Sequence, residues 1–194
     1  LQAKMATGQC PGDYPDIELV WIAPEGSGPS HGFYVGKFEV TNAEFAFFLN
    51  DIELSQDGAT PTTSFSPRGH VVYDGSGEVI RTQPAESDSR IIYDIGMVTG
   101  SRFGPAPGFE RHPVIHVSWF GAAMFCNWLT TRSGLGLQHT CYDETDYFRP
   151  RAISAGSWYR RDLNEGERAE LVEKYRGFRL PMDSFELVRA APRT

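Results

Sequence analysis

The chain of 194 residues is poor in cysteine and has no long apolar run. Its three cysteines, Cys10, Cys126 and Cys141, are a small and odd number, so the sequence gives little sign of a disulfide-rich secreted scaffold. No apolar run approaches the roughly 20 residues that a membrane-spanning helix needs. We therefore expect a chain without a membrane span.

Clustered positive charge is missing as well. The formal net charge is −7, and the densest basic run, Arg160 and Arg161, is followed at once by acidic residues. Because proteins bind nucleic acids through clustered lysine and arginine side chains, we expect no nucleic-acid partner.

The sequence carries only indirect signs of its compartment. It has no Asn-x-Ser/Thr glycosylation acceptor. Its first residue is Leu1 rather than methionine, which fits a processed precursor, a proteolytic fragment or a cloning remnant before Met5. On the first interpretation, we expect a secreted or periplasmic protein.

The composition does support a sizeable core. Hydrophobic residues make up 40% of the chain and aromatic residues 13%. A chain of this length and composition buries enough apolar surface to fold, and nothing separates a second domain. We expect a single domain.

A first block, residues 36–45, is typical of a strand that leads into a capped helix. Phe38 and Val40 alternate with charged residues, which predicts a half-buried strand. Thr41 and Glu44 then have the spacing of a capping box, in which each side chain bonds the backbone amide of the other. The helix that follows places four apolar residues on one stripe: Phe45, Phe48, Leu49 and Ile52.

A second block, residues 112–129, repeats this logic. Pro113 precedes a short alternating run from Val114, which predicts a strand, and Ser118 is a helix N-cap residue. The helix is expected over residues 119–129, ending before Gly134. Its predicted buried face consists of Ala122, Phe125, Cys126 and Leu129.

A third block follows at Gly177-Phe178-Arg179-Leu180-Pro181. With these three motifs in this order, the sequence resembles the family of formylglycine-generating enzymes, or sulfatase-modifying factors (FGE-sulfatase). The resemblance implies an α+β, C-type-lectin-like fold, rich in loops, with short antiparallel strands and a few capped helices. It places an N-terminal extension at residues 1–17 and the family domain at residues 18–194, incomplete on its C-terminal side. Gly121 departs from the family, which has Asp or Glu at that position.

The resemblance also bears on chemistry. The family's enzymes oxidise a substrate cysteine to formylglycine, using dioxygen and copper held by two cysteine thiolates near the far C-terminal end of the domain. No residue of this chain matches those thiolates, so we expect no catalytic residue here, and copper only if the missing half is present.

The sequence leaves more than one role open for the three cysteines. Cys126 matches a structural family position, which implies either a small buried hydrophobe or half of a disulfide whose partner lies in the missing part. Pairing of Cys10 with Cys141 stays open, because sequence alone does not determine it.

Loops dominate between the blocks. Residues 55–69 are rich in Ser, Thr, Pro and Gly, and residues 74–77 predict the turn of a hairpin between residues 71–73 and 78–80. A short apolar run follows at residues 91–95. A further helix is expected from the cap Asn164 to Gly177.

Several residues suggest metal ligands. His112 and His116 have helical ligand spacing, but in a strand four residues span about 13 Å, too far for one ion. His139 and Cys141 lack a third ligand. The acidic set Asp143, Glu144 and Asp146 is a calcium candidate, although it lacks the spacing of a known calcium loop.

Two functions therefore remain. We favour a non-catalytic module that acts outside the cytoplasm, either by binding a ligand or as a structural unit that packs against other chains, because the thiolate pair is missing and fold alone does not confer function. The alternative is a formylglycine-generating oxidase whose catalytic half is absent or on another chain. In either case, an incomplete domain would leave part of its apolar core uncovered. We therefore expect the chain to associate with another protein chain or with the missing C-terminal half.

Overall fold

The computed structural model describes residues 17–23, 33–54, 63–65, 70–73, 77–83, 88–143, 149–150, 174, 177–178 and 180. The chain forms two compact units, Glu39–Phe125 on the one hand and Leu1–Phe38 with Cys126–Thr194 on the other.

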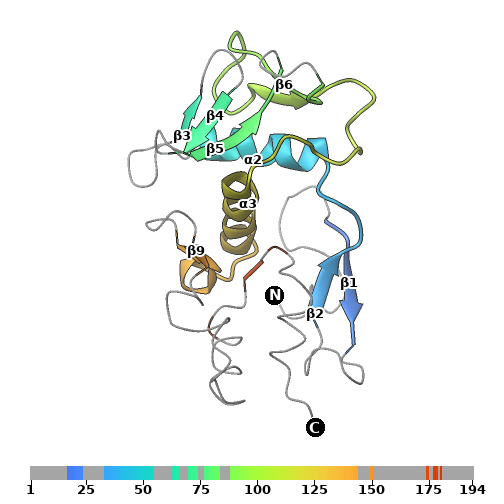
Figure 1. The fold of residues 1–194 in the computed structure, drawn as a ribbon, viewed down its shortest axis with the longest axis vertical. Coiled ribbons are helices and arrows are strands. Elements are labelled where there is room, and N and C mark those ends of the chain that lie inside the picture. The colour runs from blue at the N-terminus through green and yellow to red at the C-terminus, as the bar shows by residue number, and fades with distance from the viewer. Residues whose placement is uncertain are drawn as a thin grey trace. The chain divides into compact units, whose positions relative to one another are not determined.

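Helix α2 (Asn42–Leu54) opens the unit Glu39–Phe125 (Figure 1). The predicted capping box is confirmed: the Thr41 amide donates to a carboxylate oxygen of Glu44 at 2.7 Å, and the Glu44 amide donates to the Thr41 hydroxyl at 3.3 Å. Of the predicted stripe, Phe45, Phe48 and Leu49 are buried and Ile52 is half-buried. The local sequence pattern is therefore sufficient to define this helix.

The prediction of a half-buried strand at residues 37–40, immediately before α2, is wrong. The strand at this place is β2 (Phe33–Gly36), which pairs with β1 (Leu19–Ile22) and ends where Gly36 faces Leu19. One further bond, from the Lys37 amide to the Glu18 carbonyl, follows before residues 37–40 leave the pairing. Phe38 is 66% exposed, so its alternation with charged residues does not reflect a buried face.

A three-stranded antiparallel sheet follows α2, in the order β3 (Thr63–Phe65), β4 (His70–Tyr73) and β5 (Gly77–Arg81) (Figure 1). The predicted hairpin is confirmed by the β4–β5 pair, which carries a bulge between Val71 and Val72. The expectation of a loop over residues 55–69 is wrong at β3. That strand is defined by pairing with β4 rather than by its own Ser- and Thr-rich sequence.

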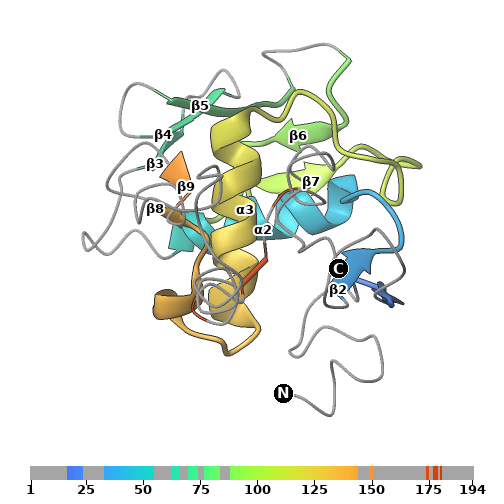
Figure 2. The ribbon, with the colours of Figure 1, turned by 60° about the horizontal axis from the view of Figure 1, so that its bottom comes forward.

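The first three residues of the apolar run at residues 91–95 form strand β6 (Ile91–Tyr93). It pairs antiparallel with β7 (Phe103–Pro105). Gln83, just after β5, exchanges backbone hydrogen bonds with Ile91 and Tyr93 on the other side of β6. Helix α2 packs against β7 (Figure 2).

An aromatic cluster occupies the core of this unit. Phe125 stacks on Phe45 with ring centroids 5.6 Å apart and meets Phe48 edge-on at 5.4 Å. All three rings are at most 5% exposed. Burial of each is worth roughly 1.5–3 kcal/mol relative to exposure, which makes this cluster a major source of the unit's stability.

Helix α3 (Trp119–Arg132) begins as predicted but runs three residues further than expected. The Ser118 hydroxyl accepts a hydrogen bond from the Gly121 amide at 3.1 Å, which confirms the N-cap. The strand predicted from Val114 is wrong, because the described residues here form only single bridges, Pro113 with Thr41 and Val117 with Ile80.

In the other unit, β1 and β2 form a hairpin, and the C-terminal part of α3 continues into the 3-10 helix η1 (Leu137–His139). Two short strands, β8 (Tyr142–Asp143) and β9 (Arg149–Pro150), pair antiparallel. The helix predicted from Asn164 to Gly177 lies outside the described residues except at Lys174, which is helical, and at Gly177.

The described residues thus have an α+β architecture, with two α-helices and short antiparallel strands. Neither α2 nor α3 has the length and apolar composition needed to cross a membrane, and the described parts of the chain contain no other such helix. The division into residues 1–17 and 18–194 stays a prediction.

Gly121, the departure from the family pattern, has a packing reason. A Cβ built at this position would lie 2.3 Å from the carbonyl oxygen of Val79, which accepts the Ser118 amide at 3.0 Å. The first turn of α3 therefore approaches β5 too closely for any side chain.

We expect Gly121→Ala to lower the free energy of unfolding by about 2 kcal/mol, because overpacking against a backbone atom outweighs the higher helix propensity of alanine. Urea unfolding followed by circular dichroism measures this. Gly104→Ala in β7 is the matched control, since a Cβ there meets no atom within 4 Å. Equal stability of the two variants would contradict the packing explanation.

Candidate functional site

The connection between β6 and β7, residues 94–102, carries apolar side chains into solvent. Ile95 is 56% exposed, Met97 49% and Val98 73%. We call residues 94–102 the β6–β7 loop. Exposed apolar side chains that are contiguous in sequence indicate a contact surface more than isolated ones do.

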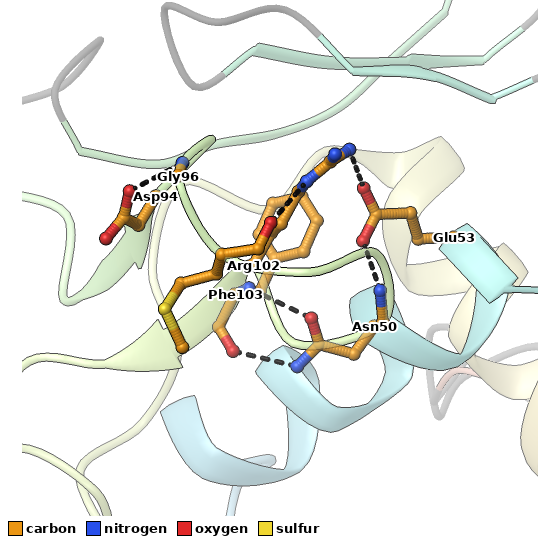
Figure 3. A network of polar contacts seen from close by, with 8 residues as sticks. Asn50, Glu53, Asp94, Gly96, Arg102 and Phe103 are labelled. Carbon is orange, nitrogen blue, oxygen red and sulfur yellow. Dashed lines mark hydrogen bonds and ion pairs between the residues drawn. The ribbon is translucent and has the colours of Figure 1, made fainter.

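Two polar side chains of α2 hold this loop at its base (Figure 3). Asn50 donates to the Phe103 carbonyl at 2.8 Å and accepts from the Phe103 amide at 2.9 Å. Glu53 accepts from the Gly100 amide and from the Arg102 guanidinium, both at 2.8 Å. Because these residues are three apart, they project from the same side of the helix.

Further bonds within the loop define its path. The Asp94 carboxylate accepts from the Gly96 amide at 2.8 Å, and the Arg102 side chain donates to the Met97 carbonyl at 3.2 Å (Figure 3). Gly100 has a φ of 83° and packs on Leu54. The loop therefore presents its apolar side chains on a backbone fixed at both ends and at its turn.

Sequence reasoning missed Asn50 and Glu53 as functional positions. The side chain of Glu53 is 3% exposed and pairs with Arg102, whose side chain is 28% exposed. A usable signal was present in the sequence: two polar residues, three apart, lie beside the apolar stripe of α2. Their partners lie about 50 residues away in the sequence and could not be read from it.

The third sequence block docks in the other unit through its backbone. The Gly177 amide donates to the His139 carbonyl at 3.0 Å, the Phe178 amide to the Thr130 hydroxyl at 2.8 Å, and the Leu180 amide to the Tyr142 hydroxyl at 2.9 Å. A Cβ at Gly177 would lie 2.4 Å from the His139 carbonyl oxygen. Position 177 therefore requires glycine, because its backbone lies too close to the His139 carbonyl for a side chain.

Cys126 and Cys141 lie in the same unit and are each 7% exposed. Burial raises the pKa of the Cys126 thiol, and the nearby Cys141 raises it further. At physiological pH, Cys126 therefore carries its proton, which favours the structural interpretation over a reactive thiolate.

The histidine pair has separate roles. His112 packs beside the Phe109 ring, with centroids 5.0 Å apart. His116 has a φ of 62° and lies 3.0 Å from the Asp88 carboxylate. The strand assumed for these residues is wrong, but each histidine has its own partner.

The remaining metal candidates are only partly described. His139 ends the 3-10 helix η1 and bonds the Lys174 carbonyl through Nδ1 at 2.9 Å. Asp143 is half-buried in β8, whereas Glu144 and Asp146 lie outside the described residues. Among the residues that are described, no three His, Cys, Asp or Glu side chains gather as a metal-binding group.

We expect Glu53→Gln to lower the free energy of unfolding by about 1–3 kcal/mol, because a buried charge-assisted network loses its anion while Arg102 stays in place. Chemical unfolding measures the loss. Glu18→Gln is the control, since Glu18 pairs with Lys37 at the surface, where ion pairs contribute under about 1 kcal/mol. Similar losses in both variants would contradict this prediction.

Thr130→Val tests the docking of the third block. The substitution keeps the shape of the side chain but removes the acceptor of the Phe178 amide, so we expect a loss of about 1–3 kcal/mol in unfolding free energy. Thr131→Val is the control, because the Thr131 hydroxyl bonds only the Trp128 carbonyl among the contacts described for it. If the two variants lose the same stability, Thr130 has no special role.

Comparison with known proteins bears on the family resemblance. The sequence model of the sulfatase-modifying factor enzyme 1-like domain matches residues 9–193. The formylglycine-generating enzyme of Mus musculus is 28% identical over 128 residues, which is 62% of this chain and 32% of the mouse protein. The chain thus corresponds to about a third of that relative's length. No solved structure matches. The extent of the family match shows that the chain belongs to the FGE-sulfatase family.

Proposed function

We propose that this chain is a non-catalytic FGE-sulfatase module that binds another protein outside the cytoplasm through the β6–β7 loop. The observation that carries the proposal is the exposure of Ile95, Met97 and Val98 on a backbone held by α2. A loop that is rigid before binding loses little conformational entropy when a partner covers it. Apolar side chains on such a loop supply the energy of association.

The alternative function is oxidation of a substrate cysteine to formylglycine, as the name of the mouse relative suggests. That chemistry uses copper held by two thiolates, and the described cysteines do not fit such a site. Cys126 is buried, with a pKa raised by that burial, and Cys141 points its sulfur at the Gly177 carbonyl at 3.4 Å. A buried, protonated thiol is a poor copper ligand, because the thiolate is the form that binds metal.

The calcium candidate remains a separate prediction, since Glu144 and Asp146 lie outside the described residues. Calcium at residues 143–146 would be bound by carboxylate oxygens and would add to the module without changing the binding role of the loop.

The binding role is tested by selecting peptides from a displayed random library on the purified chain. We expect selected peptides to bind the native chain and to lose about tenfold in affinity with Val98→Ser, because contact with this side chain contributes about 1.4 kcal/mol. Leu137→Ser is the matched control, since Leu137 in η1 is 66% exposed but outside the loop. Peptides that bind both variants and the native chain equally would refute the proposed surface.

The non-catalytic part of the proposal is tested with the reduced chain, Cu(I) and a cysteine-containing peptide in oxygenated buffer. We expect less than one copper per chain by elemental analysis and no aldehyde in the peptide by mass spectrometry. Stoichiometric copper together with aldehyde formation would establish the oxidase instead.

A further inference from the structure

Two buried cysteines lie on neighbouring stretches of one unit. Cys126 is on the inner side of α3, and Cys141 follows η1 directly before β8. They are separated by 15 positions in the sequence, and the chain between them turns back through Gly134 and Gly136, both with positive φ.

The residue after each cysteine connects the two stretches. The side-chain amide of Asn127 donates to the Tyr142 carbonyl at 2.9 Å and accepts from the Tyr142 amide at 3.2 Å. Asn127 and Tyr142 are both at most 1% exposed. The two backbones are therefore one asparagine side chain apart, next to the cysteines, in a place from which water is excluded.

The two sulfur groups also affect each other. Besides burial, Cys141 raises the pKa of Cys126, which agrees with the position of the two cysteines on connected stretches of backbone. Two buried thiols, each next to a residue of the Asn127–Tyr142 pair, fit a structural cross-link better than a reactive site.

We propose that Cys126 and Cys141 form a disulfide when the chain folds in an oxidising compartment. The oxidant is a disulfide of low molecular mass or a protein disulfide. One cysteine thiolate attacks the oxidant and releases a thiol, and the second thiolate then displaces the other thiol from the mixed disulfide. The products are one protein disulfide and two thiols, which retain the two protons.

Cys126 and Cys141 are free thiols in the structure, and formation of the disulfide would change two weak contacts of the Cys141 sulfur. In the reduced form the Cys141 sulfur donates to the Gly177 carbonyl at 3.4 Å and lies 4.0 Å from the His139 carbonyl. Thiols are weak donors, so turning the sulfur toward Cys126 costs little. The cross-link would hold α3 to the segment that accepts the third sequence block.

This inference is independent of the binding role of the β6–β7 loop. It identifies the partner of Cys126 within the chain, in place of a partner in a missing segment, and it excludes pairing of Cys141 with Cys10.

The test uses the full chain, unfolded and reduced, then refolded in a mixture of reduced and oxidised glutathione and blocked with iodoacetamide. Tryptic cleavage separates Cys126 in residues 112–132, Cys141 in residues 133–151 and Cys10 in residues 5–37. We expect residues 112–132 linked to residues 133–151, and Cys10 carrying the alkyl group. Alkylation of Cys126 and Cys141, or linkage of either one to Cys10, would overturn the proposal.

Thermal unfolding gives a second readout. A disulfide that closes a loop of this length raises the melting temperature by about 5–10 °C, so we expect reductant to lower it by that amount in the refolded native chain. Cys10→Ala should keep the dependence on reductant and Cys141→Ala should lose it. A dependence on reductant that persists in Cys141→Ala would refute the pairing.

Discussion

The fold depends on one constraint, the need of buried backbone groups for hydrogen-bond partners where strands are too short to supply them. The described strands have two to five residues. Polar side chains on the two helices take over this role. In one unit Asn42 donates to the carbonyls of Phe109 and His112, and Asn50 pairs with Phe103. In the other, Asn127 pairs with Tyr142, and Thr130 accepts from Phe178.

This arrangement connects the fold to the proposed function. When helix side chains fix the ends of a loop, the exposed middle of the loop is free to vary in sequence without loss of the scaffold. The β6–β7 loop illustrates it, since Glu53 and Asn50 hold its base while its apolar residues face solvent. A family that uses one scaffold with different loops can include members with and without catalysis, and this chain is proposed as one without.

Local features of the sequence predict much of the fold. The capping box of α2, the N-cap of α3 and the β4–β5 hairpin depend on residues near one another in the chain, and all three are confirmed. Features set by distant residues were not predicted. Strand β3 depends on β4, Gly121 depends on the Val79 carbonyl, and the roles of Asn50 and Glu53 depend on a loop about 50 residues away. The family resemblance was readable because its three motifs retain their order.

Native-state amide hydrogen exchange tests the central claim most directly. Three amides outside the helices, those of Gly100, Phe103 and Phe178, donate to helix side chains. If these bonds replace a continuous sheet, the three amides exchange within about tenfold of the interior amides of α2 and α3, because they open only when the unit opens. Exchange at the rate of an unprotected loop would contradict the account.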